Sequence, residues 1–266
     1  MTEALYTDRL TRRFGELTVV DSLSLSIEDG EVFGLLGRNG AGKSTLIKML
    51  TTLLPATSGS ARVGGFDIAR QATEVRRLIG YVPQALSADG ELTGYENLKV
   101  FTQLYDIPRA LREQRIHEGL EFMGLSDAAD KLVGAYSGGM IRRLEIAQSM
   151  LHRPKVLFLD EPTVGLDPVA REAVWTHIKQ LRDSYGMTIF LTTHYMEEAE
   201  HLCSRLGILR RGKLVALGTL AEIGAASGLG NVGLDPLFAH FTEDSTESEG
   251  EYGEAANARS TSQRLG

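Results

Sequence analysis

The 266-residue sequence lacks the features that mark secreted and membrane-spanning proteins. Its single cysteine, Cys203, excludes an internal disulfide and any metal site built from several cysteines, which suits a reducing compartment. The longest apolar runs, such as Val156-Leu157-Phe158-Leu159, are far too short to cross a bilayer. The N-terminal segment MTEALYTDRL contains acidic residues and no apolar stretch, so it predicts no secretory signal. The composition is therefore that of an ordinary globular protein.

The sequence also lacks a block of basic charge. Of the net charge of −7, residues 242–266 contribute −4, which leaves only −3 for residues 1–241. A nearly neutral domain without a basic cluster gives no indication of a nucleic-acid partner. Residues 242–266 are rich in Ser, Thr, Gly and Glu and cannot bury enough apolar surface to fold alone. We therefore expect a folded domain at 1–241 and an acidic, disordered tail at 242–266.

Hydrophobic periodicity within the folded part indicates both strands and helices. Apolar and polar residues alternate over Ser22–Ile27, which predicts a half-buried strand, and a continuous apolar strand follows at Val32–Leu36. Leu46, Ile47, Leu50, Leu53 and Leu54 form a helical stripe that ends at Pro55. Residues 90–135 read mostly as helices. Further strands are expected at Val156–Leu159 and Thr188–Leu191, with a late hairpin at Leu206–Leu209 and Leu214–Leu217. This order predicts a mixed α/β core with a helical insertion at about 85–152.

A phosphate-binding loop lies between the predicted strand Val32–Leu36 and the first predicted helix. It fits G-x-x-x-x-G-K-[ST], and with the next residue it comprises Gly37, Arg38, Asn39, Gly40, Ala41, Gly42, Lys43, Ser44 and Thr45. The glycines let backbone N–H groups close around phosphate oxygens. Lys43 supplies positive charge to the β- and γ-phosphates, and the Ser44 hydroxyl is a ligand for Mg²⁺. A glycine-rich turn with an incidental lysine is the alternative, and the flanking strand and helix argue against it.

Three further sites carry polar residues that suit nucleotide hydrolysis. Asp160 ends an apolar strand and is suited to hold Mg²⁺, and the adjacent Glu161 could orient or deprotonate the attacking water. His194 follows the strand Thr188–Leu191, where its imidazole could bond the γ-phosphate. Gln84 ends another apolar run, where its amide could reach Mg²⁺ or the water. Taken singly, the acids could be a solvated strand end, the histidine structural and the glutamine incidental.

The stretch Tyr136–Leu151 begins with Ser137, Gly138 and Gly139 and continues as a helix, which makes a second anion-binding helix N-terminus. A protein that binds phosphate on its own has no evident need for a second anion-binding helix N-terminus that lacks a lysine. Along this helix Met140, Leu144, Ala147 and Leu151 form one buried stripe, and we expect Arg142 and Arg143 to be turned away from the core.

Taken together, these motifs resemble those of the ATP-binding-cassette (ABC) ATPases over about residues 4–220. The motifs follow one another in the family's order. In this resemblance residues 37–45 correspond to Walker A, Gln84 to the Q-loop, Ser137–Gly139 to the signature, Asp160 and Glu161 to Walker B with its catalytic glutamate, Asp167 to the D-loop, and His194 to the switch histidine. Phe14 corresponds to the aromatic residue that stacks on adenine, although Tyr6 is nearby. Tyr136 and Met140 replace the Leu and Gln that are commonest in the family.

The resemblance implies an α/β P-loop NTPase fold with a mixed sheet, an N-terminal antiparallel β subdomain and a helical signature subdomain. It further implies ATP and Mg²⁺ as ligands, and head-to-tail pairing in which the signature of one domain caps the γ-phosphate held by the other. Variants such as Glu-Pro-Thr-Val-Gly-Leu-Asp-Pro at 161–168 resemble multidrug exporters of the ABC-2, daunorubicin-resistance type.

That resemblance implies a homodimer or paired ATPase at the cytoplasmic face of a membrane, driving a separately encoded transmembrane subunit. The alternative is an ABC ATPase that acts on nucleic acid or ribosomes without a membrane partner. About a hundred residues without sustained heptads separate Walker A from the signature, unlike the long coiled coils of DNA-repair members. A small-molecule kinase would share the phosphate loop but would not explain Ser137–Gly139 or Glu161.

Overall fold

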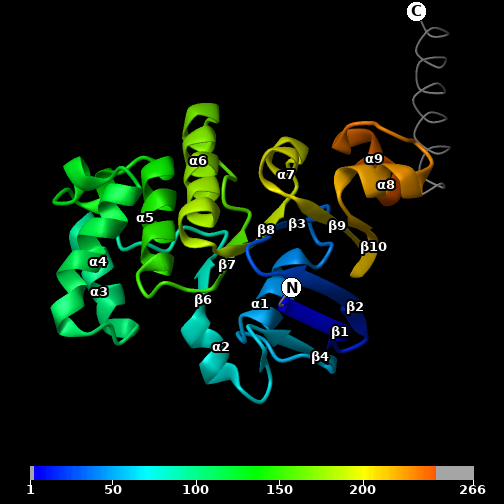
Figure 1. Cartoon of the computed structure of the whole chain (residues 1–266), viewed down its shortest axis with the longest axis horizontal. Coiled ribbons are helices and arrows are strands. Elements are labelled where there is room, and N and C mark those ends of the chain that lie inside the picture. The colour runs from blue at the N-terminus through cyan, green and yellow to red at the C-terminus, as the bar shows by residue number, and fades with distance from the viewer. Residues whose placement is uncertain (1–2, 244–266) are drawn as a thin grey trace, which may run out of the picture.

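Two β-sheets and the helices around them make up the computed structural model, which describes residues 3–243 (Figure 1). The strands are β1 Glu3–Phe14, β2 Leu17–Glu28, β3 Val32–Leu36, β4 Ser58–Val63, β5 Phe66–Asp67, β6 Ile79–Val82, β7 Val156–Asp160, β8 Thr188–Thr193, β9 Arg205–Arg210 and β10 Lys213–Gly218. The α-helices are α1 Lys43–Leu50, α2 Ala72–Leu78, α3 Gly94–Leu104, α4 Arg109–Phe122, α5 Gly138–Met150, α6 Pro168–Tyr185, α7 Met196–Leu202, α8 Leu220–Ser227 and α9 Leu234–Thr242. Short 3₁₀ turns lie at Ser126–Ala128 and Val133–Ala135.

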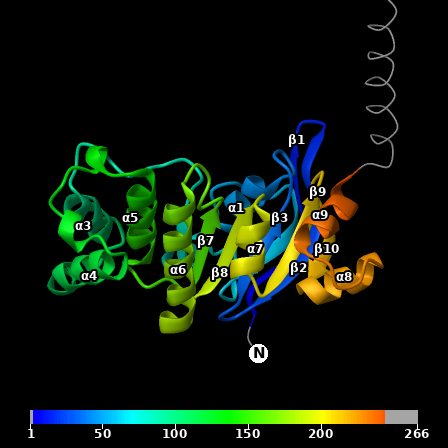
Figure 2. The ribbon, with the colours of Figure 1, turned by 90° about the horizontal axis from the view of Figure 1, so that it is seen from above.

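The larger sheet has six strands in the order β10-β9-β3-β8-β7-β6. Strands β9, β3, β8, β7 and β6 are parallel, and β10 pairs antiparallel with β9. Every residue of β3, β7 and β8 is buried, as continuous apolar strands covered on both faces must be. Because all of these strands run in one direction, their carboxyl ends meet at one edge of the sheet (Figure 2).

The smaller sheet is antiparallel, with the strand order β2-β1-β4-β5. Over Ser22–Ile27 strand β2 alternates between buried and less buried positions, and Leu23, Leu25 and Ile27 face the core as their spacing predicts. Helix α1 packs between this sheet and the parallel one, so the apolar faces of both contribute to one core.

Helices α3, α4 and α5 form a separate group beside the parallel sheet, on the left in Figure 1. Helix α3 begins with a reciprocal capping arrangement, in which the side chains of Thr93 and Glu96 each accept the other residue's backbone N–H. The apolar residues of α3, α4 and α5 join those of α6 and β7 in a second core. The expected α/β class, with a mixed sheet, an antiparallel N-terminal sheet and a helical insertion, is confirmed.

Two details of the sequence interpretation are wrong. The first helix ends at Leu50, and Leu53, which the spacing places in its apolar stripe, is 60% exposed. The backbone N–H groups of Leu53 and Leu54 both return to the carbonyl of Lys48, which closes the helix before Leu53 could face the core. In addition, Arg142 is buried, as described below. The predicted tail lies almost wholly outside the described residues, and α9 continues to Thr242.

Candidate nucleotide-binding and hydrolysis site

The carboxyl ends of three neighbouring strands bring the predicted site residues together. In the parallel register Leu36 of β3 lies opposite Thr193 of β8, and Thr192 of β8 lies opposite Asp160 of β7. The phosphate loop follows β3, Glu161 follows β7 and His194 follows β8. Ligands of open α/β sheets bind at this edge, so the topology alone makes one site of segments far apart in the chain.

The phosphate loop requires glycine at particular positions. Gly42 has φ +110°, and a Cβ there would lie 2.5 Å from the carbonyl oxygen of Val19. A Cβ on Gly37 would lie 2.8 Å from the carbonyl oxygen of Leu209. The loop turns into α1 around a cavity of about 280 Å³, lined by Val19, Asn39, Gly40, Ala41, Gly42, Lys43, Ser44, Thr45, Gln84 and Glu161. Backbone N–H groups at the start of α1 therefore face a space that suits phosphate.

The Lys43 ammonium is the buried cation of this site. Its Nζ donates to the carbonyl oxygen of Gly37 at 2.7 Å and lies 3.0 Å from Oε1 of Glu161. The Lys43 and Glu161 side chains are only 4% and 6% exposed. A carboxylate and an ammonium removed from water to this extent require each other, because either one left alone would pay its full desolvation penalty.

The other oxygen of Glu161 faces two more of the predicted residues. The Gln84 amide donates to Oε2 at 3.2 Å, and Nδ1 of His194 lies 3.2 Å from the same oxygen without the alignment of a hydrogen bond. The Glu161 carboxylate thus brings together Lys43, Gln84 and His194, so residues predicted from four separate stretches of sequence meet at one point.

Glu161 also has an unusual backbone. Its φ is +50°, in the left-handed region that a residue with a side chain seldom occupies. The backbone N–H of Glu161 is shared between the carbonyl and the hydroxyl oxygens of Thr192, each at 3.1 Å. Strained backbone of this kind persists where the surroundings hold it, and it concentrates at functional sites.

Asp160 and Ser44 form the candidate Mg²⁺ site. The Ser44 hydroxyl donates to Oδ1 of Asp160 at 3.1 Å, and the Thr192 hydroxyl donates to the same oxygen at 2.6 Å. Within residues 3–243 no three His, Cys, Asp or Glu side chains cluster as metal ligands. One carboxylate and one hydroxyl fit Mg²⁺, which usually completes its shell with water and phosphate oxygens.

Burial and the nearby Asp160 raise the pKa of Tyr81 to about 12, so this phenol stays neutral.

The predicted signature opens α5, outside the phosphate cavity. Ser137 is the N-cap residue of α5, and its hydroxyl accepts the backbone N–H of Met140 at 3.3 Å. A Cβ on Gly139 would lie 2.7 Å from Cβ of Ala170, so α5 approaches the start of α6 closely. Asp167 caps α6 in the same way, accepting the N–H of Ala170 at 2.9 Å. None of these residues lines the cavity formed by the phosphate loop of the same chain.

Arg142 corrects the sequence interpretation of α5. Instead of turning away, it is only 2% exposed and lies 2.9 Å from Glu145. Its guanidinium donates to the carbonyl oxygens of Pro83 and Gln84, both at 2.7 Å, and burial lowers its pKa. The reason is that α5 is covered by α3, α4, α6 and β6, which leaves no solvent face at this position. Arg142 therefore fixes the segment that carries Gln84.

Phe14 lies apart from the phosphate cavity. It ends β1, is 46% exposed, and the Arg12 guanidinium lies over its ring at 4.4 Å. It does not line the cavity, and its adenine-stacking role stays a prediction. Thr192, which bonds both Asp160 and Glu161, is a site residue that the sequence analysis missed, because a threonine in an apolar strand matches no motif.

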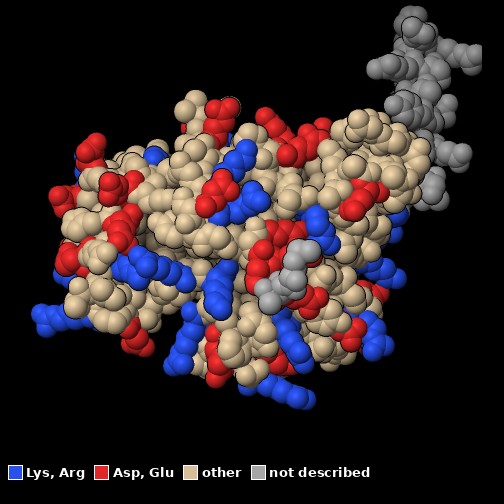
Figure 3. Space-filling model, in the orientation of Figure 1, with Lys and Arg blue, Asp and Glu red and all other residues tan. Residues whose placement is uncertain are grey.

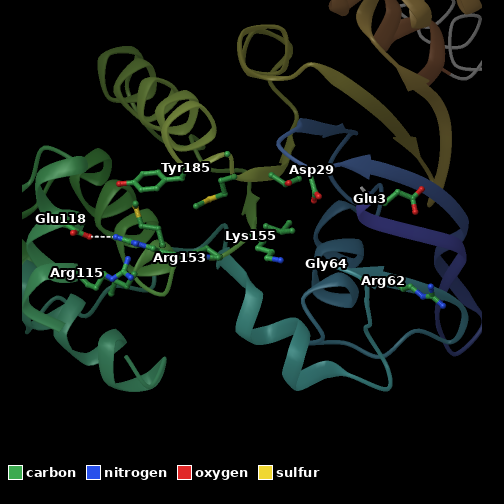
Figure 4. A pocket seen from close by; sticks show the side chains of 18 of the residues that line it. Glu3, Asp29, Arg62, Gly64, Arg115, Glu118, Arg153, Lys155 and Tyr185 are labelled. Atoms are coloured by element: carbon green, nitrogen blue, oxygen red, sulfur yellow. Dashed lines mark hydrogen bonds and ion pairs between the residues drawn. The ribbon is translucent and has the colours of Figure 1, made fainter. Parts of the chain in front are cut away.

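A larger cavity of about 970 Å³ lies at the amino ends of β7 and β8, away from the phosphate loop. Figure 4 shows Arg115, Glu118 and Arg153 on its helical side and Glu3 and Arg62 on the side of the antiparallel sheet. Arg153 and Glu118 form an ion pair of 3.3 Å there, with both side chains well exposed. No residue of the phosphate loop reaches this cavity, so it is separate from the candidate site.

Comparison with known proteins identifies the family. A family profile described as "ABC transporter" matches residues 20–164. The chain belongs to the ABC transporter family. It is 41% identical over 219 residues to the linearmycin resistance ATP-binding protein LnrL of Bacillus subtilis, which is 82% of this chain and 70% of that protein. It is 44% identical over 227 residues to the daunorubicin/doxorubicin resistance ATP-binding protein DrrA of Streptomyces peucetius, which is 85% of this chain and 68% of that protein.

Solved structures agree with this assignment. The ATP-binding subunit of an ABC transporter superposes with a TM-score of 0.81 at 30% identity, covering 90% of this chain and 100% of that one. The protein cbiO1 from Clostridium perfringens, part of the transporter complex cbiONQ, superposes with a TM-score of 0.78 at 26% identity, covering 86% and 93%.

Membership of the ABC transporter family establishes the general activity. The chain is an ATP-binding ABC ATPase, and members of this family hydrolyse ATP. ATP-binding subunits of such transporters work with separate membrane components, and pairing of two ATP-binding domains is general to the family. None of the helices within residues 3–243 has the length and apolar character needed to span a bilayer.

Proposed function

We propose that this chain is the motor subunit of an ABC-2 type exporter, in which two copies, or this chain and a paired ATPase, hydrolyse ATP at shared sites. The observation that carries the proposal is the buried pair of Lys43 and Glu161 at the phosphate loop, with Gln84 and His194 on the same carboxylate. A charged cluster of this kind is expected where a water must be activated beside phosphate.

The residue roles follow from this geometry. Backbone N–H groups of residues 37–45 would hold the phosphates, and Lys43 would share its charge between Glu161 and the β- and γ-phosphates. Ser44 and Asp160 would hold Mg²⁺, whose charge neutralises the phosphate oxygens. Glu161 would accept a proton from the attacking water, while Gln84 and His194 orient that water and the γ-phosphate.

Pairing is supported by the position of the signature. Ser137, Gly138 and Gly139 begin a helix with N–H groups available for an anion, yet they do not line the phosphate cavity of their own chain. A second domain placed head to tail would give these groups a γ-phosphate to bind. Asp167, which caps the neighbouring α6, would lie at the same interface.

Export is supported by the names of the relatives. LnrL and DrrA are resistance proteins, and Nod factor export ATP-binding protein I of Ralstonia nicotianae is 44% identical over 84% of this chain and 69% of that protein. We infer a separately encoded transmembrane subunit and a position at the cytoplasmic face of the membrane. The face in Figure 3 carries interspersed charges of both signs, so it gives no indication of nucleic-acid binding.

Two experiments test this function. The tagged chain should co-purify with the product of an adjacent gene that encodes about six apolar segments of roughly 20 residues each. The purified complex should then show Mg²⁺-dependent ATPase activity that candidate export compounds increase. Co-purification with ribosomes or DNA in place of a membrane protein, together with activity stimulated by nucleic acid, would overturn the assignment to export.

A further inference from the structure

Glu198 in α7 is a buried carboxylate that none of the roles above uses. Its exposure is 0%, and its Oε1 accepts two hydrogen bonds, from the Thr163 hydroxyl at 2.7 Å and from the Trp175 indole N–H at 3.0 Å. Within the described residues, its Oε2 has no hydrogen-bond partner. Burying a carboxyl group in this way is costly, so its presence calls for an explanation.

The two donors come from segments that carry candidate site residues. Thr163, itself 0% exposed, lies two residues after Glu161. Trp175 belongs to α6, which Asp167 caps. Glu198 lies four residues after His194, in the helix that begins immediately beyond Tyr195. One carboxylate oxygen therefore joins the segments that follow β7 and β8, at the point where both leave the sheet.

The turn after β7 needs such an anchor. Its first residue, Glu161, has φ +50°, and strained backbone persists only where the surrounding structure holds it. Thr192 holds the backbone N–H of Glu161, and the Thr163 hydroxyl is held by Glu198 two residues further on. The Glu161 carboxylate and His194 lie 3.2 Å apart, and hydrogen bonds made by Thr192 and by Glu198 join the segments that carry them.

We propose that Glu198 is a positioning residue for ATP hydrolysis, which fixes Glu161 relative to His194 through the Thr163 hydroxyl. The inference rests on the roles proposed above for Glu161 and His194. Glu198 touches neither of them and does not line the phosphate cavity. Its effect should therefore fall on the chemical step and leave nucleotide binding intact.

Substitutions at Glu198 separate hydrogen bonding from filling of space. Glu198→Gln keeps an amide oxygen that can accept both donors, whereas Glu198→Leu fills a similar volume and accepts neither. In steady-state ATPase assays we expect Glu198→Leu to lower kcat by ~10–100-fold, the range for a catalytic group misplaced by about 1 Å. The KM for MgATP should change by less than about two-fold, because uniform binding is untouched. Glu198→Gln should stay within about three-fold of wild type.

A second variant removes the bond from the other side. Thr163→Val has nearly the same shape and lacks the hydroxyl, so it should lower kcat with unchanged KM, as Glu198→Leu does. Combining it with Glu198→Leu should cause no loss beyond that of Glu198→Leu alone, because Glu198→Leu has already removed the bond to the Thr163 hydroxyl. Glu197→Gln is the matched control for Glu198→Gln, because it makes the same chemical change at the neighbouring position of the same helix. The Glu197 side chain is 75% exposed and forms only an ion pair of 3.6 Å with Arg171. Glu197→Gln should behave as wild type.

Thermal unfolding and the fraction of protein that binds ATP are measured for each variant beside the kinetics. If Glu198→Leu does not fold, Thr163→Val alone tests the positioning role. Folded Thr163→Val with a wild-type kcat overturns the proposal, as does Glu198→Gln that is as slow as Glu198→Leu. A fall in kcat that is fully explained by a smaller fraction of ATP-binding protein also overturns the proposal. If Thr163→Val is fast and Glu161→Gln is inactive, only this inference fails, whereas a fully active Glu161→Gln defeats the proposed site itself.

Discussion

The two ends of the parallel sheet differ in a way that cavity size does not reveal. The amino end has the larger cavity, about 970 Å³, and its ion pair Arg153–Glu118 has side chains that are 57% and 40% exposed. The carboxyl end has about 280 Å³, but its pair Lys43–Glu161 is only 4% and 6% exposed. Charged residues line both cavities, and Figure 4 shows those of the larger one, whose ion pair is exposed, whereas the pair in the smaller cavity is buried.

Burial of the pair is the informative difference. An exposed ion pair is worth little and needs no function to explain it. A buried pair costs desolvation free energy, which a polar network must offset, and such networks are concentrated at sites that handle charge, although Arg142 and Glu145 show that they also serve structure. At the carboxyl end the network extends from Lys43 through Glu161 to Gln84 and His194. The comparison can be tested by changing charges at each end.

The largest effect is expected from Lys43→Ala. Removing the ammonium takes positive charge from the phosphates, and ATPase activity should fall by ~100-fold or more. The variant also leaves the buried Glu161 carboxylate without its cation, so thermal unfolding must be measured beside activity. Folded Lys43→Ala protein with near-normal ATPase activity would contradict the assignment of this site to nucleotide hydrolysis.

Glu161→Gln should slow hydrolysis by ~100-fold or more, the usual contribution of a general base. The amide keeps the size of the side chain and much of its hydrogen bonding, so ATP should still bind. Because bound ATP persists, the variant should accumulate as a dimer in MgATP on size-exclusion chromatography. A wild-type turnover rate would show that another group activates the water.

A mixture of two inactive variants tests whether the signature serves a second chain. Lys43→Ala and Gly138→Asp should each be inactive alone. In a mixed dimer, both defects meet at one interface, and the other interface combines an intact Lys43 with an intact signature. Mixing should therefore restore part of the ATPase activity. Since cooperation between sites could hide the rescue, ATP-dependent pairing of the two tagged variants is measured as well. Neither rescue nor pairing, with both proteins folded, would defeat the shared-site model.

Arg142→Met should mainly reduce stability. The substitution leaves Glu145 buried without its cation and frees the carbonyl oxygens of Pro83 and Gln84. Loss of one partner of a buried pair costs about 3–5 kcal/mol of unfolding free energy. Arg143→Met is the matched control, because Arg143 is only partly buried and donates to the carbonyl oxygen of Met123 at 2.8 Å. Equal midpoints of urea unfolding for the two variants would contradict the structural role of Arg142.

The sequence predicts well what depends on contiguous motifs and on strand ends. The loop at 37–45, Asp160, Glu161 and His194 could be assigned to one edge because apolar runs show where strands end, and parallel strands end together. The strand Val32–Leu36 was predicted at its observed bounds.

The parts that sequence could not supply depend on what covers an element from outside. Periodicity showed which residues of α5 share a face, but it could not show that helices and a strand surround Arg142. Likewise Thr192 and Glu198 act through hydrogen bonds to other segments, and no spacing within the chain encodes such partners. Leu53 fits a helical stripe by spacing, yet the helix has already ended.

The smallest effect is expected at the amino end of the sheet. Lys155→Ala and Arg115→Ala remove cations that line the larger cavity, far from the phosphate loop. ATPase activity should stay within about two-fold of wild type in both variants, and stability within about 0.5 kcal/mol for Lys155→Ala, whose side chain is exposed. Lys43→Ala is the paired measurement, since it also removes one cation, from a position that is 4% exposed. If Lys155→Ala slowed hydrolysis as much as Lys43→Ala does, burial of charge would no longer distinguish the working end of the sheet from the other.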